Sequence, residues 1–157
     1  MKKYRAGLCL AAALLGAGAA FAAVELKPQK HGQCYTAEQL FVLDKEGAGG
    51  GMGTLHGEFA FRREQATDDQ AIKEIGLMTL KKGASIGMHP HVDNDDAYII
   101  IAGTGVFTGS DGKEIEVGPK SVTIAGPGES HALRNDNDQD LVFIDLIAKN
   151  HALKIAK

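Results

Sequence analysis

The stretch from Gly83 to Gly103 reads GASIGMHPHVDNDDAYIIIAG and places two histidines between two runs that are typical of strands. Residues i and i+2 of a strand point to the same face, so His89 and His91 present two imidazoles to one point. Asp96 opens the following run, and a hairpin-like return would bring its carboxylate beside the rings. Two histidines at this spacing also occur in exposed loops, so the pair alone leaves both interpretations open.

A third histidine, His131, follows a Gly-Pro-Gly turn at 126–128, where another strand is expected to begin. Three imidazoles and a carboxylate would form a mixed nitrogen and oxygen set, which suits a single divalent ion of Fe, Mn, Ni, Cu or Zn. The remaining three histidines have no partner at ligand spacing, and we interpret them as surface residues. They are His31, His56 and His151.

From residue 58 onward the chain consists of short runs rich in β-branched and aromatic residues, most of them separated by glycine-containing turns. These runs are Glu58–Arg63, Ile72–Leu80, Ile86–His91, Ala97–Ala102, Gly105–Thr108, Glu114–Val117, Ser121–Ile124, His131–Asn135 and Leu141–Ala148. The dipeptide Asp111-Gly112 supplies the positive φ values that a tight hairpin turn requires. Many short strands with little helix predict an all-β fold, an antiparallel barrel or sandwich.

The first histidine motif resembles that of the cupins, which reads G-x5-H-x-H-x3–4-E-x6-G. Gly83, His89, His91 and Gly103 stand at the corresponding positions, and Asp96 replaces the glutamate. The second cupin motif ends P-x-G-x2-H-x3-N and is matched more loosely. There Gly128, His131 and Asn135 fit, whereas Gly126 stands where proline is usual.

The resemblance covers about residues 72–147 and implies a cupin-type jelly-roll β-barrel with one metal ion inside. The ligands that it implies are His89, His91, Asp96 and His131. Aspartate is one methylene shorter than glutamate, so Asp96 could bind after a slight backbone shift, bind through water, or leave a three-histidine site. Asp95 is a poorer alternative because it would break the six-residue spacing to Gly103.

Alternation along the strand that follows Asp96 would also turn Tyr98 and Ile100 into the barrel. Tyr98 is then a candidate catalytic residue that could hydrogen-bond a ligand beside the metal, and a core tyrosine is the alternative. The intervening residues Ala97, Ile99 and Ile101 would form an outward apolar stripe. Such a stripe usually meets another layer, and a second subunit in a homodimer is one option.

Residues 1–22 have the layout of a secretory signal peptide, with a basic stub, an apolar run and a small-x-small pattern at 20–22. The apolar run is short and interrupted by glycine for a membrane span of ~20 residues. We therefore expect cleavage after Ala22 and a periplasmic or secreted protein that does not bind the membrane after cleavage.

Cleavage would leave residues 23–157, a suitable length for one domain. Loss of Lys2, Lys3 and Arg5 leaves 14 basic against 20 acidic residues, a formal net charge of −6. An acidic chain without a basic cluster argues against a nucleic-acid partner. Cys34 is the lone cysteine after the signal, which excludes an intramolecular disulfide.

We expect residues 23–57 to form an extended leader with a short helix and a glycine-rich loop, followed by the barrel at 58–148 and a tail at 149–157. Thr36 and Gln39 form a capping-box pattern that predicts a helix to about Leu43. The loop 47–53 lacks the context of a phosphate-binding loop, and we interpret it as a flexible connector.

Cupins include oxygenases, isomerases, lyases and non-catalytic binders, so the resemblance does not name a reaction. The first hypothesis is an exported metal-dependent enzyme acting on a small polar molecule. The second is a non-catalytic module that binds a small ligand or the metal itself. The two are nearly balanced because, apart from Tyr98, the sequence nominates no acid or base for proton transfer.

Overall fold

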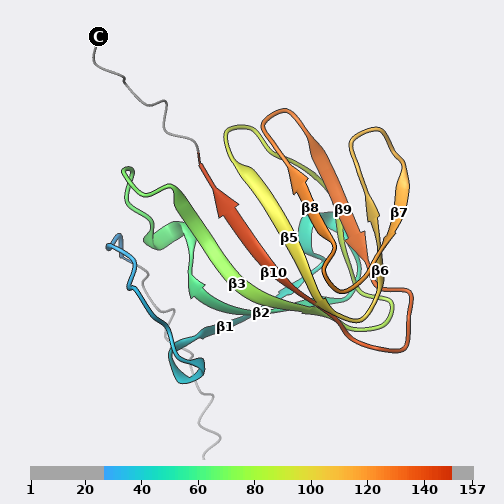
Figure 1. Cartoon of the computed structure of the whole chain (residues 1–157), viewed down its shortest axis with the longest axis horizontal. Helices are drawn as coiled ribbons and strands as arrows, with labels where there is room; N and C mark the ends of the chain where they lie inside the picture. Colours follow the sequence, from blue (N-terminus) through green and yellow to red (C-terminus); the bar gives the residue numbers. More distant parts are fainter. Residues whose placement is uncertain (1–26, 150–157) are drawn as a thin grey trace, which may run out of the picture.

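Two antiparallel β-sheets form the structure, a computed structural model that describes residues 27–149 (Figure 1). The larger sheet runs in the order β1 (Phe41–Glu46), β2 (Thr54–Phe61), β3 (Ile72–Leu80), β10 (Leu141–Ala148), β5 (Asp95–Ala102) and β8 (Val122–Ala125). The smaller sheet runs in the order β4 (Ser85–Pro90), β9 (Ser130–Arg134), β6 (Gly105–Thr108) and β7 (Glu114–Val117). The predicted all-β jelly-roll fold is therefore confirmed, and each expected run is a strand, with bounds shifted by a few residues at most.

The inner faces of the two sheets supply the core because side chains alternate along each strand. In β10, Leu141, Phe143, Asp145 and Ile147 are buried while the residues between them are partly exposed. In β5 the same alternation buries Asp96, Tyr98 and Ile100, as predicted. Each fully buried aliphatic or aromatic side chain contributes about 1.5–3 kcal/mol, so register errors in these strands would be costly.

The helix expected to run from Thr36 to about Leu43 is wrong in its extent. The side chain of Gln39 accepts the backbone N–H of Thr36 at 2.9 Å, but the helical part is a single 3-10 turn, η1 (Ala37–Gln39). The next residues form β1, whose Phe41 and Leu43 pack against the core. Burial of such side chains outweighs a helix propensity difference below about 0.7 kcal/mol per residue.

The larger sheet begins before the expected barrel boundary at residue 58. Strand β1 pairs with β2 from Phe41 opposite Phe59 to Glu46 opposite Thr54. Part of the expected leader is therefore an edge of the barrel, and the alternation of its inner and outer residues was the signal for it.

The glycine-rich loop 47–53 is hydrogen-bonded to the first residue of β4. Ser85 exchanges hydrogen bonds with Met52, its N–H donating to the carbonyl at 2.8 Å and its hydroxyl accepting the amide at 2.8 Å. A Cβ on Gly51 would lie 2.3 Å from the carbonyl oxygen of Ser85. Only glycine permits this close approach of the loop to β4.

The outer face of β5 and β8 carries the apolar stripe expected from the sequence. Ile101, Val122 and Ile124 are 48%, 58% and 63% exposed, and Ile124 lies opposite Ala97 across the strand pair. A homodimer through this face stays a prediction.

Within the described chain, no helix is long and apolar enough to cross a membrane, and Cys34 is exposed and free. The expected signal at 1–22 lies outside the described residues, as does most of the expected tail at 149–157.

Candidate metal centre

Strands β4 and β9 place two histidines directly opposite one another, since His89 pairs with His131 in the strand register. A β-bulge between Ile86 and His89 resets the alternation of β4, so that these two residues both face the interior although they are three apart. His91 follows the end of β4 and is 6% exposed. Asp96, near the start of β5, reaches the same point from the larger sheet.

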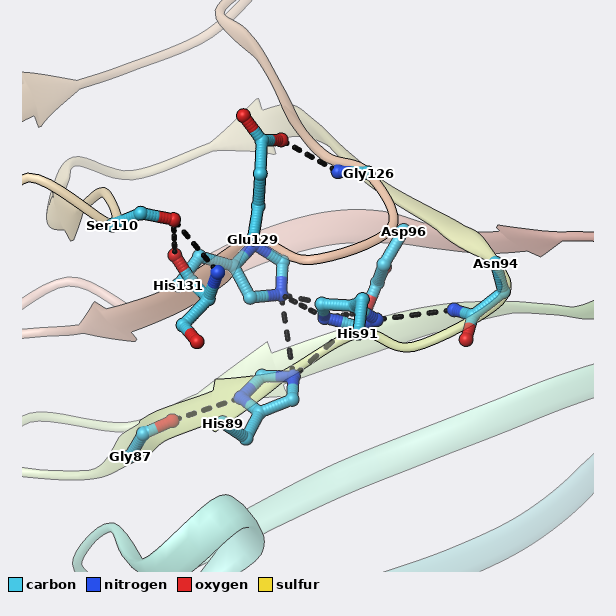
Figure 2. Close-up of polar contacts among 10 residues, drawn as sticks. Gly87, His89, His91, Asn94, Asp96, Ser110, Gly126, Glu129 and His131 are labelled. Carbon is cyan, nitrogen blue, oxygen red and sulfur yellow. Dashed lines mark hydrogen bonds and ion pairs between the residues drawn. The ribbon is translucent and has the colours of Figure 1, made fainter.

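The donor atoms of these four residues surround one point between the two sheets (Figure 2). The Nε2 atom of His131 lies 3.1 Å from Nε2 of His91 and 3.2 Å from Nε2 of His89. Oδ2 of Asp96 lies 3.4, 3.6 and 3.9 Å from Nε2 of His131, His91 and His89. Ligands with metal bonds of about 2.0–2.2 Å lie about 3.0 Å apart at right angles and about 3.5 Å apart at tetrahedral angles. The observed spacing fits this geometry.

The contact on the far side of the His89 ring favours the tautomer that a metal requires. Nδ1 of His89 donates to the carbonyl of Gly87 at 2.9 Å, which leaves the Nε2 lone pair facing the centre. The amide nitrogen Nδ2 of Asn94 lies 3.0 Å from Nδ1 of His91 (Figure 2). Turning this amide by 180° would bring its oxygen to the same place, where it would accept the ring N–H when a metal binds Nε2. Lone pairs that converge at about 3 Å repel one another unless a cation lies between them, so the donor set fits a divalent ion.

His131 is oriented by packing. Its ring is fully buried and stacks on Tyr98, with centroids 4.7 Å apart and planes inclined by 20°. Phe107 meets the same ring edge-on at 5.9 Å. Nδ1 of His131 is buried and has no hydrogen-bond partner within residues 27–149. Tyr98 therefore lies beside the candidate ligands, as the sequence predicted, and at least part of its role is to hold a ring in place.

Asp96 and Asp145 form a carboxyl pair beside the candidate centre. Oδ1 of each is buried and meets no N–H donor in the described chain, and the two side chains are hydrogen-bonded to one another. Burial and the negative charge of Asp96 raise the pKa of Asp145 well above its usual range. Burial opposes the charged form of Asp96, but the neighbouring rings of His131 and His89 outweigh it and hold the pKa of Asp96 well below its usual range. Of the two carboxyl groups, Asp145 is therefore the one that holds a proton more readily.

The pKa values of two histidines differ because their surroundings differ. The nearby carboxylate of Asp96 raises the pKa of His89, whereas burial lowers the pKa of His91. An imidazole must be neutral to bind a metal, so His91 is the better prepared of the two in the absence of an ion.

A cavity of about 180 Å³ adjoins these residues. Its lining is Lys45, Ala48, Gly49, Leu55, Arg63, Glu74, Ile86, His89, Asp96, Tyr98, Asp145 and Ile147. Sequence reasoning missed the charged members apart from Asp96. One signal was present for Asp145, because it is the charged residue of an otherwise apolar run and shares an inward face with Phe143 and Ile147.

Two of the predicted surface histidines, His56 and His31, lie outside the group of candidate ligands. Nδ1 of His56 is 2.6 Å from Oδ1 of Asp44 at an exposed site, and His31 packs its edge against Phe61. His151 lies outside the described residues. Asp95 stands on the opposite face of β5 from Asp96, so alternation excludes it from the set.

Comparison with known proteins agrees with this architecture. The model of the cupin domain matches residues 76–147. An oxalate-binding protein of Thermotoga maritima is 36% identical over 98 residues, which cover 62% of this chain and 78% of that protein.

Solved structures show the same likeness. A crystal structure from Thermotoga maritima, described as a predicted oxalate decarboxylase, superposes with a TM-score of 0.67 and 25% identity over 74% of this chain and 99% of that one. The cupin domain of Schizosaccharomyces pombe Cnp3 superposes with a TM-score of 0.57 and 14% identity over 75% and 74%, which shows a common fold. The domain match and the 36% identical relative show that this chain belongs to the cupin superfamily.

Proposed function

We propose that this protein holds one divalent metal ion through His89, His91, Asp96 and His131, and that the ion binds a small carboxylate. One observation carries the proposal: three imidazole nitrogens meet a carboxylate oxygen at 3.4–3.9 Å beside a small cavity. The likeness to an oxalate-binding protein supports the class of ligand. When bound, a divalent ion there would supply Lewis-acid chemistry with open positions for an oxygen ligand.

Metal content and carboxylate binding can be measured separately. We expect about one ion per chain by elemental analysis of protein purified from its native host, and the element found would identify the metal. Calorimetry with oxalate should show binding to metal-loaded protein and none to metal-free protein. Because oxalate chelates free ions, the metal content is measured again after the titration. Equal binding by both forms would contradict the proposal.

A metal-dependent enzyme is the second candidate, and the cavity lining favours it. The carboxyl of Asp145 and the hydroxyl of Tyr98 belong to side chains that line the same cavity as His89 and Asp96. Both groups can hold or donate a proton, which catalysis on a carboxylate normally requires. Incubation of metal-loaded protein with oxalate, followed by analysis for formate, carbon dioxide and peroxide, distinguishes turnover from binding.

We also propose export, on the basis of the composition of residues 1–22. Sequencing of the mature N-terminus should then begin at or near Ala23 in protein recovered outside the cytoplasm. An intact segment from Met1 to Ala22 in the membrane fraction would contradict it.

A further inference from the structure

We propose that Lys45 and Arg63 form a cationic wall of the cavity. One carboxylate of a small dianion would bind the metal, and these two side chains would bind the other carboxylate. The inference deepens the proposed function and rests on it. It names the class of ligand, a short dicarboxylate, and the two side chains that would distinguish it from a monocarboxylate.

Lys45 is half-buried, and its side chain lines the cavity. Strand β1 alternates, so Lys45 shares its inner face with Phe41 and Leu43, which pack against the core. Its Nζ atom lies 5.4 Å from the centre of the buried Phe59 ring. Within residues 27–149 no carboxylate lies within ion-pair distance of this ammonium. The Phe59 ring already offers this ammonium a cation–π contact, and an anionic ligand in the cavity would add a direct ion pair.

Arg63 brings a second positive charge to the same cavity. Its Nε atom lies 3.3 Å from Oε2 of Glu74, and Nε of the neighbouring Arg62 lies 3.7 Å from the same oxygen. Glu74 is therefore shared by two guanidinium groups, and Arg62 has a second partner in Glu64, whose Oε1 lies 3.0 Å from its Nη2. The side chain of Arg63 is 55% exposed, so its remaining N–H donors are free to meet a ligand at the cavity rim.

The charge balance of the lining favours an anion. A divalent ion with Asp96 leaves one positive charge, Lys45 adds a second, and Arg63 is balanced by Glu74. A dianion would neutralise this set when Asp145 is uncharged, and the balance stays positive even when Asp145 is charged. Leu55, Ile86 and Ile147 complete the lining, and their low polarity strengthens each charge interaction.

The size of the cavity limits the ligand. Its volume of about 180 Å³ is below the roughly 300–1,000 Å³ of sites that hold drug-sized molecules. An acid of two to four carbons fits this space, with one carboxylate for the metal and the other for Lys45 and Arg63.

The test compares a dicarboxylate with a monocarboxylate. Calorimetry on metal-loaded protein measures the affinity for oxalate and for acetate in the wild type, Lys45→Met and Arg63→Gln. We expect each variant to bind oxalate about 10–100-fold more weakly, the effect of losing one charged hydrogen-bond partner, and to bind acetate within threefold of the wild type. Metal content should not change, because neither side chain belongs to the ligand set.

Two further variants keep the outcome interpretable. Lys45→Arg retains the charge and should restore most of the oxalate affinity, which a merely structural loss in Lys45→Met would not predict. Lys113→Met removes an exposed lysine that pairs with Asp111, and it should bind oxalate as the wild type does. Oxalate affinities of Lys45→Met and Arg63→Gln within twofold of the wild type would overturn the inference. Failure of the wild type to bind either acid would instead refute the proposed function itself.

Discussion

The two sheets contribute different chemistry to the candidate site. The smaller sheet supplies His89 and His131, with His91 at the end of β4, and all three side chains are uncharged when they bind a metal. The larger sheet supplies the groups that carry or exchange charge, namely Lys45, Glu74, Asp96, Tyr98 and Asp145. One layer is therefore suited to chelation and the other to tuning the centre and binding a ligand. Substitutions in the two sheets should then have separable effects.

Loss of a histidine contributed by the smaller sheet or the end of β4 should have the largest effect on metal content. His91→Ala removes one of three imidazoles and leaves the buried Asp96 carboxylate with fewer partners, so we expect metal content to fall well below one ion per chain. The matched control is His56→Ala, which removes an exposed histidine that contacts Asp44. Elemental analysis after dialysis checks both proteins, and equal losses would end the assignment.

Asp96 is the ligand from the larger sheet, and its replacement tests whether charge and chelation can be separated. Asp96→Asn preserves size but removes the negative charge, and we expect metal affinity to fall by about 10–100-fold. Asp96→Glu restores the side chain that the cupin motif usually has, and it should retain metal because the spacing of 3.4–3.9 Å leaves room for adjustment. Competition with a chelator of known affinity measures both. A crystal structure with metal should show an Asp96 oxygen within about 2.0–2.2 Å of a zinc-like ion.

The comparison also explains what could be predicted from the sequence. The histidine motif was legible because its members are close in the chain and their spacing reports directly on ligand geometry. The roles of Lys45 and Asp145 could not be predicted in this way, because they depend on the strand order. Asp145 reaches the site because β10 lies between β3 and β5, and Lys45 reaches it because β1 forms the edge of the same sheet. Hydrophobic alternation fixes which face a residue occupies, but it does not fix the strand order. The bulge in β4 that turns both Ile86 and His89 inward left no sequence signal that we recognise.

Replacement of Asp145 should affect stability more than metal binding. Unlike the preceding substitutions, it should improve the property that is measured. Its pKa is raised in the folded protein, so the folded state keeps a proton that an unfolded aspartate releases above about pH 4. Stability contributed by this proton is present below pH 4 and is lost as pH rises toward the folded pKa. The asparagine of Asp145→Asn has no proton to lose in this pH range, and its amide N–H can still donate a hydrogen bond to Asp96. We expect the metal-free variant to melt roughly 2–6 °C higher than the wild type at pH 7, about 1 kcal/mol, with little difference near pH 4.

Thermal melts between pH 4 and 8 measure this difference. Asp138→Asn is the control, because Asp138 is an exposed carboxylate that pairs with Lys82. If the wild type and Asp145→Asn lose stability in parallel across this range, Asp145 does not hold the proton that we assign to it.

The smallest effect should come from Tyr98, the residue at which the two sheets meet. Its ring belongs to β5 and stacks on His131 of β9, and its side chain also lines the cavity. Tyr98→Phe keeps the stacked ring and removes only the hydroxyl, so we expect metal content to stay within error of the wild type. Loss of one neutral hydrogen bond to the ligand should weaken oxalate binding by roughly three- to tenfold. Tyr98→Ala removes the ring as well, and the resulting freedom of His131 should lower metal affinity. If Tyr98→Phe binds oxalate as tightly as the wild type while Tyr98→Ala loses metal, the tyrosine serves the site through packing alone.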